Sequence, residues 1–143
     1  MSVRRQDGLA EQSITEAIIR AFFDVYNNLG FGFLESVYMA ALERELVRRG
    51  HRVTREVKVR VYYKGEAIAW QRIDMLVDDK VVVELKSTEL LPPASSRQLD
   101  SYLRATQLEV GLLLHFGPQP KFFRHYWPNS RKDALPTHPQ FPT

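Results

Sequence analysis

Residues 72–86 read RIDMLVDDKVVVELK, and this stretch decides which fold the sequence predicts. The apolar run at 81–83 is typical of a central strand that is covered on both faces of a sheet. The segment from about residue 67 to 77 predicts a neighbouring strand, and the polar residues 78–80 predict the turn between the two. Each of these apolar strands also carries an acidic residue, which calls for an explanation.

The position of the two acids depends on the register of these strands. If the turn has three residues, Val77 faces Val81, and Asp74 lies directly opposite Glu84 with Cβ atoms about 4.5–5.5 Å apart. A two-residue turn would pair Asp74 with Val83 instead and would send Glu84 to the other face of the sheet. The three-residue turn therefore predicts two carboxylates that are close enough to share one cation.

Two basic residues are expected beside this acidic pair. Lys86 is two residues beyond Glu84, so it projects from the same face, and Arg72 precedes Asp74 by two in the same way. Paired carboxylates repel, and their burial is costly unless a cation neutralises them. A bound Mg²⁺ would remove the repulsion and polarise a phosphodiester. Lys86 would then orient the attacking water or offset transition-state charge, and Arg72 would pair Glu35 or Glu84, or meet a phosphate.

A structural interpretation of the same residues stays open. The spacing D-x₉-E-x-K is a loose pattern, and an Asp–Lys–Glu cluster on an exposed sheet face would also produce it. The four histidines lack ligand spacing, and structural or incidental roles are favoured for them.

The composition predicts one domain. The chain has 143 residues, of which 44% are hydrophobic, and it has no cysteine. Disulfides and thiolate zinc sites are therefore excluded. No apolar run approaches the roughly 18 residues of a membrane span, and no signal-peptide pattern is present, so we expect a cytoplasmic protein without a membrane partner. The net charge of +3 does not by itself indicate nucleic-acid binding.

The remaining periodicities predict helices and strands in the order ααβββαββ. Residues 13–16 have the form of a capping box at a helix start. We expect the other elements at these places: a helix from Ser13 to about Asn28, a helix with an apolar stripe from Leu34 to Leu46 that stops at Gly50, a strand over 53–63, a hairpin turn at 64–66, a helix capped by Ser95 or Ser96 that ends near Thr106, and strands over 110–116 and 121–127. Residues 1–12 are expected to form a flexible N-terminus, 13–127 the domain, and 128–143 a proline-rich disordered tail.

Two motifs resemble a known group of proteins. Asp74 followed by 84–86 resembles the D…(D/E)-x-K motif of the PD-(D/E)XK nuclease superfamily. The segment 32–38, GFLESVY, is similar to the G-x-x-E-x-x-Y signature of the GxxExxY family, a family of small prokaryotic proteins in that superfamily. The resemblance covers roughly residues 13–127. It implies a restriction-endonuclease-like α/β (α+β) fold with a mixed β-sheet flanked by helices.

The resemblance also implies further site residues. Glu35 would enter the site as a third acidic ligand or a water-mediated one, although an acid at a helix N-terminus is favourable by up to about 1 kcal/mol without any function. Gln98 and Tyr102 are similar to the Q-x-x-x-Y motif of RecB-type and lambda-exonuclease-type members, in which the glutamine holds a strand oxygen or a water. Tyr38 and Tyr102 are equally consistent with the core, and Gly32 is expected to supply an unusual backbone angle.

The expected function is that of a Mg²⁺- or Mn²⁺-dependent nuclease, with DNA favoured over RNA as substrate. The expected catalytic residues are Glu35, Asp74, Glu84, Lys86 and Gln98, and the expected metal ligands are Asp74, Glu84 and Glu35. The alternative is a non-catalytic nuclease-fold adaptor that binds nucleic acid or a protein partner. Many small superfamily members dimerise, so a homodimer is expected by analogy.

Overall fold

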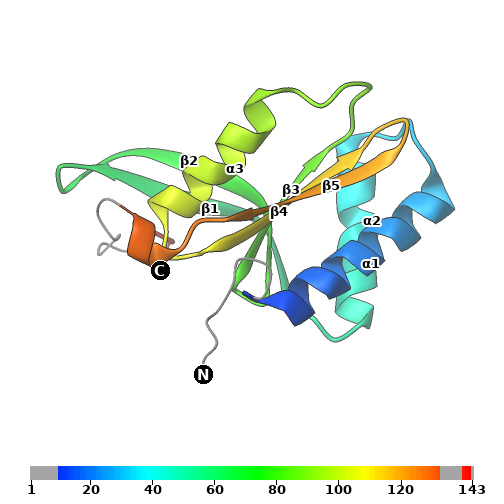
Figure 1. Ribbon diagram of the computed structural model, residues 1–143, viewed down its shortest axis with the longest axis horizontal. Coiled ribbons are helices and arrows are strands. Elements are labelled where there is room, and N and C mark those ends of the chain that lie inside the picture. The colour runs from blue at the N-terminus through cyan, green and yellow to red at the C-terminus, as the bar shows by residue number, and fades with distance from the viewer. Residues whose placement is uncertain (1–9, 133–139, 143) are drawn as a thin grey trace.

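The computed structural model describes residues 10–132 and 140–142 and shows the predicted order of elements. The elements are α1 (Gln12–Leu29), α2 (Glu35–Arg48), β1 (Val53–Tyr63), β2 (Glu66–Val77), β3 (Val81–Lys86), α3 (Ala94–Ala105), β4 (Val110–Phe116), β5 (Pro120–Tyr126) and a 3₁₀ turn at Asn129–Arg131. Figure 1 shows α1 and α2 on one side of the twisted sheet and α3 on the other. The predicted α/β fold with helices flanking a sheet is confirmed. No helix in the described ranges is long and apolar enough to cross a membrane.

The sheet has five strands in the order β1-β2-β3-β4-β5. β3 and β4 are parallel and are joined through α3, whereas the other neighbours are antiparallel. Every residue of β4 and all but the last of β3 are buried, because helices cover both faces of these central strands. The sheet is therefore mixed, as predicted, and its middle lies between two hydrophobic cores.

The two cores have different compositions. Between the sheet and α1 and α2, the core includes Phe22, Tyr38, Leu42, Val83 and Phe116. Between the sheet and α3, it includes Val59, Ile73, Leu99, Tyr102 and Leu113. The second core is the one that borders the candidate site.

The turn between β2 and β3 has the three-residue form. Val77 pairs with Val81, and the ladder continues to Met75 and Val83. Asp78 and Asp79 both have positive φ angles, of 54° and 57°, a conformation that aspartate tolerates better than most residues. The Asp78 carboxylate also accepts the amide of Arg52 at 2.9 Å, which holds the turn against the start of β1. The register on which the site prediction depends is confirmed.

The beginning of α1 differs from the prediction. The helix begins at Gln12, so Ser13 lies inside its first turn and the capping box at 13–16 is wrong. Glu11 takes the N-cap position in a left-handed conformation, and its carbonyl accepts the amide of Thr15 at 3.0 Å. The first turn is thereby closed before Ser13 can cap it, and Glu16 instead accepts a bond from the Gln12 side chain at 3.0 Å.

Two other helix starts also correct the prediction. α3 begins at Ala94 with Pro93 at the N-cap position, so Ser95 and Ser96 lie within the first turn and neither caps the helix. Leu34 is the N-cap of α2 and is 75% exposed, because it precedes the helix and does not belong to its apolar stripe. That stripe consists of Tyr38, Met39, Leu42 and Leu46.

The described parts of the expected tail contact the domain. Residues 129–131 form the 3₁₀ turn, and the Lys132 ammonium donates to the carbonyls of Thr106 and Leu108 at 2.6 and 3.0 Å. The Gln140 carbonyl accepts the amide of Arg60 in β1 at 2.6 Å. These described residues are held against the domain, and the expected disordered tail as a whole stays a prediction. Residues 1–9, 133–139 and 143 lie outside the described residues, so the boundaries at 13 and 127 stay predictions.

Candidate active site

The two central acids are joined through main-chain hydrogen bonds. The ladder between β2 and β3 runs as far as Met75 and Val83, and the next residues are Asp74 and Glu84. The Asp74 amide donates to Glu84 Oε1 at 3.1 Å, and the Leu85 amide donates to Asp74 Oδ2 at 2.9 Å. Each carboxylate thus takes a bond that a strand carbonyl would otherwise accept. Within the described residues, Asp74 Oδ1 and Glu84 Oε2 have no hydrogen-bond partner.

Both acids open into one pocket of about 300 Å³. Its walls come from β2, the end of β3, and α3. The lining residues are Gln71, Arg72, Asp74, Glu84, Lys86, Gln98 and Tyr102. The structure therefore brings together four of the five residues that the sequence suggested for catalysis.

The pocket disfavours negative charge on its acids. Burial, with Asp74 nearby, raises the pKa of Glu84 from 4.5 to about 8. Burial likewise raises the pKa of Asp74, although the Leu85 amide and the Lys86 ammonium act in the opposite direction. Lys86 is partly buried and lies close enough to lower the pKa of both carboxylates, yet the net shift stays upward. The two cations of the lining, Arg72 and Lys86, therefore do not offset the cost of burying two carboxylates.

A divalent cation held by both carboxylates would offset this burial cost. The donor atoms are hard carboxylate oxygens, and Mg²⁺ is commonly bound by one or two carboxylates together with waters and substrate phosphates. Asp74 and Glu84 each have one oxygen to offer. Across residues 10–132 and 140–142, no three acidic or histidine side chains are arranged to hold one ion. The residues present therefore fit an ion with two protein carboxylates and open positions for oxygen ligands from solvent or substrate.

Glu35 lies beside the pair, at the first position of α2. Burial and the nearby Asp74 raise the pKa of the Glu35 carboxyl. The Lys86 ammonium and a hydrogen bond from the Ser87 amide act in the opposite direction, and the net shift is upward. This mutual influence places Glu35 in the electrostatic neighbourhood of the site. It is not grouped with Asp74 and Glu84 around a single point, so its role as a third metal ligand stays a prediction.

Tyr38 holds the loop that precedes Glu35. Its ring is fully buried and stacks on Phe116 with centroids 4.1 Å apart. Its hydroxyl donates to the Gly30 carbonyl and accepts the Phe33 amide at 3.3 Å. Tyr38 therefore belongs to the core, and its polar end fixes the backbone that delivers Glu35.

The same loop is tied to the end of β3. Gly32 has a φ of 116°, which L residues with a side chain rarely adopt, so the expected unusual backbone angle is present. The Ser87 hydroxyl donates to the Phe33 carbonyl at 2.5 Å. Ser87 thus contacts the loop with its hydroxyl and the Glu35 carboxylate with its amide. This residue directly follows the VELK motif, and sequence reasoning did not single it out.

The two α3 residues of the Q-x-x-x-Y motif, Gln98 and Tyr102, lie in different environments. Gln98 is exposed and lines the pocket, as a substrate-facing side chain would. Tyr102 is 2% exposed, and its hydroxyl donates to the Arg72 carbonyl at 2.9 Å, which fixes β2 beside the site. The Arg72 guanidinium lies 3.8 Å from the Glu56 carboxylate, and it forms no ion pair with Glu35 or Glu84, so those two expected pairings are wrong.

Glu56 is a further acid that sequence reasoning missed. It lies between the pairs Arg55–Met75 and Val57–Ile73, which places it opposite Asp74, and it raises the pKa of that carboxyl. Counting back from the hairpin turn would put Arg55 there instead. An irregularity between Val61 and Tyr62 shifts the register by one residue. No local pattern in the sequence marks this shift.

Comparison with known proteins agrees with this architecture. A family model described as the PD-(D/E)XK nuclease superfamily matches residues 12–125. The chain belongs to the PD-(D/E)XK nuclease superfamily. The crystal structure of SSO0001 is similar in fold, with 18% sequence identity and a TM-score of 0.51, over 89% of this chain and 71% of that chain. A search of curated proteins found no significant match.

Proposed function

We propose that this protein is a Mg²⁺- or Mn²⁺-dependent nuclease that hydrolyses phosphodiester bonds, with DNA favoured over RNA. The observation that carries the proposal is the interlocked pair of Asp74 and Glu84, which shares one pocket with Lys86 and has raised carboxyl pKa values. Membership in the nuclease superfamily supports the same reaction class. Similarity to the GxxExxY signature supports placement in that family.

Asp74 and Glu84 would hold the ion with the oxygens that the main chain leaves open. When bound, the ion supplies positive charge that polarises the phosphodiester and favours ionised water. The amides of Asp74 and Leu85 fix the two carboxylates in one orientation, so little reorganisation is needed on binding. Glu84 must lose its proton first, and therefore metal affinity rises with pH.

Lys86 and Gln98 would act on the substrate side of the pocket. The Lys86 ammonium lines the pocket and would stabilise negative charge on the attacking water or on the phosphoryl oxygens of the transition state. The Gln98 amide, on the exposed face of α3, would donate to a strand oxygen or orient the water. Glu35, tied to Ser87 behind Lys86, would hold the lysine and water in place through its charge.

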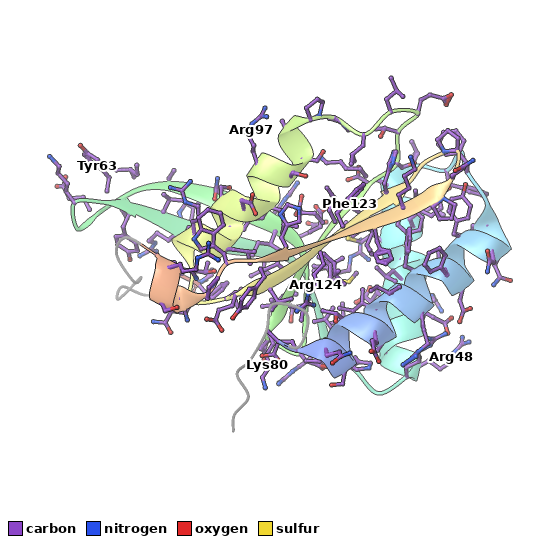
Figure 2. The ribbon with its side chains drawn as sticks, viewed as in Figure 1. Arg48, Tyr63, Lys80, Arg97, Phe123 and Arg124 are labelled. Atoms are coloured by element: carbon purple, nitrogen blue, oxygen red, sulfur yellow. The ribbon has the colours of Figure 1, made fainter. Side chains whose placement is uncertain are left out.

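The decisive experiment compares wild-type protein with Lys86→Ala. Plasmid, linear, single-stranded and structured substrates are incubated with Mn²⁺, and cleavage rates are measured at pH 8. We expect Lys86→Ala to lower the rate by about 10²-fold or more. Lys80→Ala is the matched control, because Lys80 is an exposed lysine in the turn at the other end of β3 and points away from the fold (Figure 2). If wild type and Lys86→Ala cut every substrate equally, the nuclease assignment is wrong.

A non-catalytic adaptor is the second candidate, and one observation favours it. The raised pKa of about 8 leaves Glu84 mostly protonated at pH 7, and in that state the pair carries one negative charge instead of two beside Lys86. Calorimetric titration with Mn²⁺ separates the two functions. Binding that Asp74→Asn and Glu84→Gln abolish supports the nuclease, whereas no binding in wild type supports the adaptor.

A further inference from the structure

The hairpin of β1 and β2 extends far past the rest of the sheet. β1 and β2 have 11 and 12 residues, whereas β3 has six, and the ladder between β2 and β3 ends at Met75. Residues 57–73, which we call the arm, therefore reach beyond the end of β3. Figure 1 shows the tip of the arm standing away from α1 and α2.

The arm carries as much net charge as the whole molecule. It holds four basic residues and one acidic residue, which gives +3, and the formal net charge of the complete chain is also +3. The remaining residues carry 16 basic and 16 acidic side chains. The charged residues of the arm are Lys58, Arg60, Lys64, Glu66 and Arg72. A polyanion would therefore meet its most favourable potential at the arm.

One face of the arm gathers most of these cations around an aromatic ring. Arg60 is paired with Trp70 across the strands, and Lys58 is paired with Arg72. Directly opposed residues share a face, and so do residues two apart on one strand. Lys58, Arg60, Trp70 and Arg72 therefore form one surface, which we call the arm patch.

The arm patch faces away from α3. On the other face of the arm, Val59 and Ile73 are fully buried in the core that Leu99 and Tyr102 of α3 complete. The side chains of the patch consequently lie on the uncovered face. Lys58, Trp70 and Arg72 are exposed there, Trp70 to 48%.

The patch combines a cation with an aromatic ring. The Arg60 guanidinium lies over the Trp70 ring, 4.4 Å from its centroid, so the two form a cation–π pair. Tyr63, 58% exposed, lies at the tip of the arm, where Figure 2 shows it far from the helices, but it is three residues from Arg60 and so belongs to the other face. Exposed aromatic rings between basic side chains are typical of surfaces on which unpaired bases stack.

The patch is continuous with the pocket through Arg72. Arg72 belongs to the patch and lines the pocket, and Asp74 follows it by two residues. Beyond Met75, β2 has no β3 partner within the described residues, so the pocket opens at this edge of β2. A strand that lies on the patch can pass around this edge toward Asp74 and Glu84.

We propose that the arm patch binds a single-stranded segment of nucleic acid and guides it to the pocket. Lys58 and Arg72 contact its phosphates, and one base stacks on the Arg60–Trp70 pair. The guiding part of this proposal rests on the proposed nuclease function, but the binding part does not. The nuclease substrate is then single-stranded DNA or RNA, or a branched nucleic acid with an unpaired single-stranded segment.

Duplex binding fits the patch less well. A two-stranded ribbon can enter the major groove of a duplex, where arginine forks read base edges. Here the Arg60 guanidinium lies over the Trp70 ring, and this exposed ring finds no free base face in a stacked duplex. The ring and the stacked cation both favour an unpaired strand.

The test measures binding without cleavage. Fluorescence anisotropy in EDTA reports the affinity of the full chain for a labelled 20-nucleotide single strand, as DNA and as RNA, and for the matching duplex. We expect Lys58→Ala/Trp70→Ala to weaken single-strand binding about tenfold or more. The slope of log Kd against the logarithm of the salt concentration should also fall by about 0.7, because one phosphate contact is lost. The single variant Trp70→Phe keeps an aromatic ring, so it should bind the single strand with an affinity close to that of wild type.

A matched double variant on the other edge strand serves as the control. Lys121→Ala/Phe123→Ala removes one exposed lysine and one aromatic ring of 41% exposure from β5, and we expect single-strand affinity within twofold of wild type. Equal affinities of both double variants would overturn the proposal, as would tighter Trp70-dependent binding of the duplex. The measurements with DNA and with RNA identify which single strand is preferred, and a preference for either one supports the proposal.

The result stays separable from the nuclease assignment. Trp70-dependent binding in EDTA without any cleavage in Mn²⁺ keeps the patch and removes the nuclease. Cleavage that depends on Lys86 but is unchanged by Lys58→Ala/Trp70→Ala keeps the nuclease and removes the patch.

Discussion

The backbone amide of Asp74 donates to the carboxylate of Glu84 at 3.1 Å, so the two acids of the site are linked through the main chain of one of them. Together with the bond from the Leu85 amide to Asp74, this link lets the strands separate at the site without leaving buried amides unpaired. In this arrangement the main chain bonds one oxygen of each carboxylate and leaves the other open. A site built in this way is held in shape before any ion binds.

The stability of the metal-free protein should fall as the pH rises. The pKa of Glu84 is raised from 4.5 to about 8, so the folded protein keeps a proton that the unfolded chain releases between these values. Its stabilising contribution is complete below about pH 4.5 and is lost as the pH approaches 8, with a slope of at most about 1.4 kcal/mol per pH unit. Urea unfolding in EDTA from pH 5 to 8.5 measures the slope. The same series on Glu84→Gln should lack this component, and an identical slope in both proteins would contradict the assignment.

Divalent metal should stabilise the folded protein through Asp74. At 100 times its Kd, Mn²⁺ adds about 2.7 kcal/mol to the free energy of unfolding, a rise in Tm of roughly 5–10 °C for a chain of this size. Binding at pH 7 should also release protons, because Glu84 must ionise. Asp74→Asn keeps an acceptor for the Leu85 amide but removes the charge, so it should lose the Tm increase. Asp79→Asn, in the exposed turn beside Arg52, should keep it.

Glu35→Gln should separate the two roles that were expected for Glu35. We expect cleavage to fall at least about tenfold while Mn²⁺ affinity changes less than threefold, because Glu35 is not grouped with Asp74 and Glu84 around one ion. Glutamine still accepts the Ser87 amide, so the loop should keep its position. Calorimetry and cleavage rates give the two readouts, with Glu45→Gln in the same helix as control. A loss of Mn²⁺ affinity as large as that of Asp74→Asn would make Glu35 a direct ligand.

Tyr38→Phe should affect both stability and cleavage. It removes the hydroxyl that bonds Gly30 and Phe33 and keeps the ring on Phe116, so unfolding should become easier by about 1 kcal/mol. Cleavage should fall several-fold because the loop before Glu35 is released. Tyr26→Phe is the matched control, because its hydroxyl donates to the Gly117 carbonyl at 2.6 Å and to the Pro118 carbonyl at 2.9 Å instead of bonding Gly30 or Phe33. Similar stability losses with a cleavage defect in Tyr38→Phe alone are expected, and equal cleavage in both would contradict the role of Tyr38.

Much of the site could be predicted because its residues are close in sequence or lie on adjacent strands. The period of two in β2 and β3 and the three-residue turn determine that Asp74 faces Glu84 and that Lys86 shares the face of Glu84. The segment from Gly32 to Tyr38 likewise combines a glycine conformation, an acid at a helix start and a core tyrosine within seven residues. Such short-range geometry depends on backbone periodicity alone.

The remaining features depend on contacts between distant segments, and only the tertiary structure decided them. Glu56 faces Asp74 because the register of β1 shifts near Val61, and the left-handed Glu56 lies where the strand exchanges its faces: the Arg55 side chain pairs Glu43 of α2, whereas Val57 packs toward α3. This exchange is what leaves the cations of the arm uncovered.

The sequence by itself therefore determined the order of the elements, the central strand and the facing of its acids, since these follow from local periodicity and turn length. It did not determine where α1 and α3 begin, how Ser87 joins two segments more than 50 residues apart, or which face of the arm meets solvent. Those outcomes are selected by the packing of whole elements, in which many weak contacts outweigh the preference of any single residue.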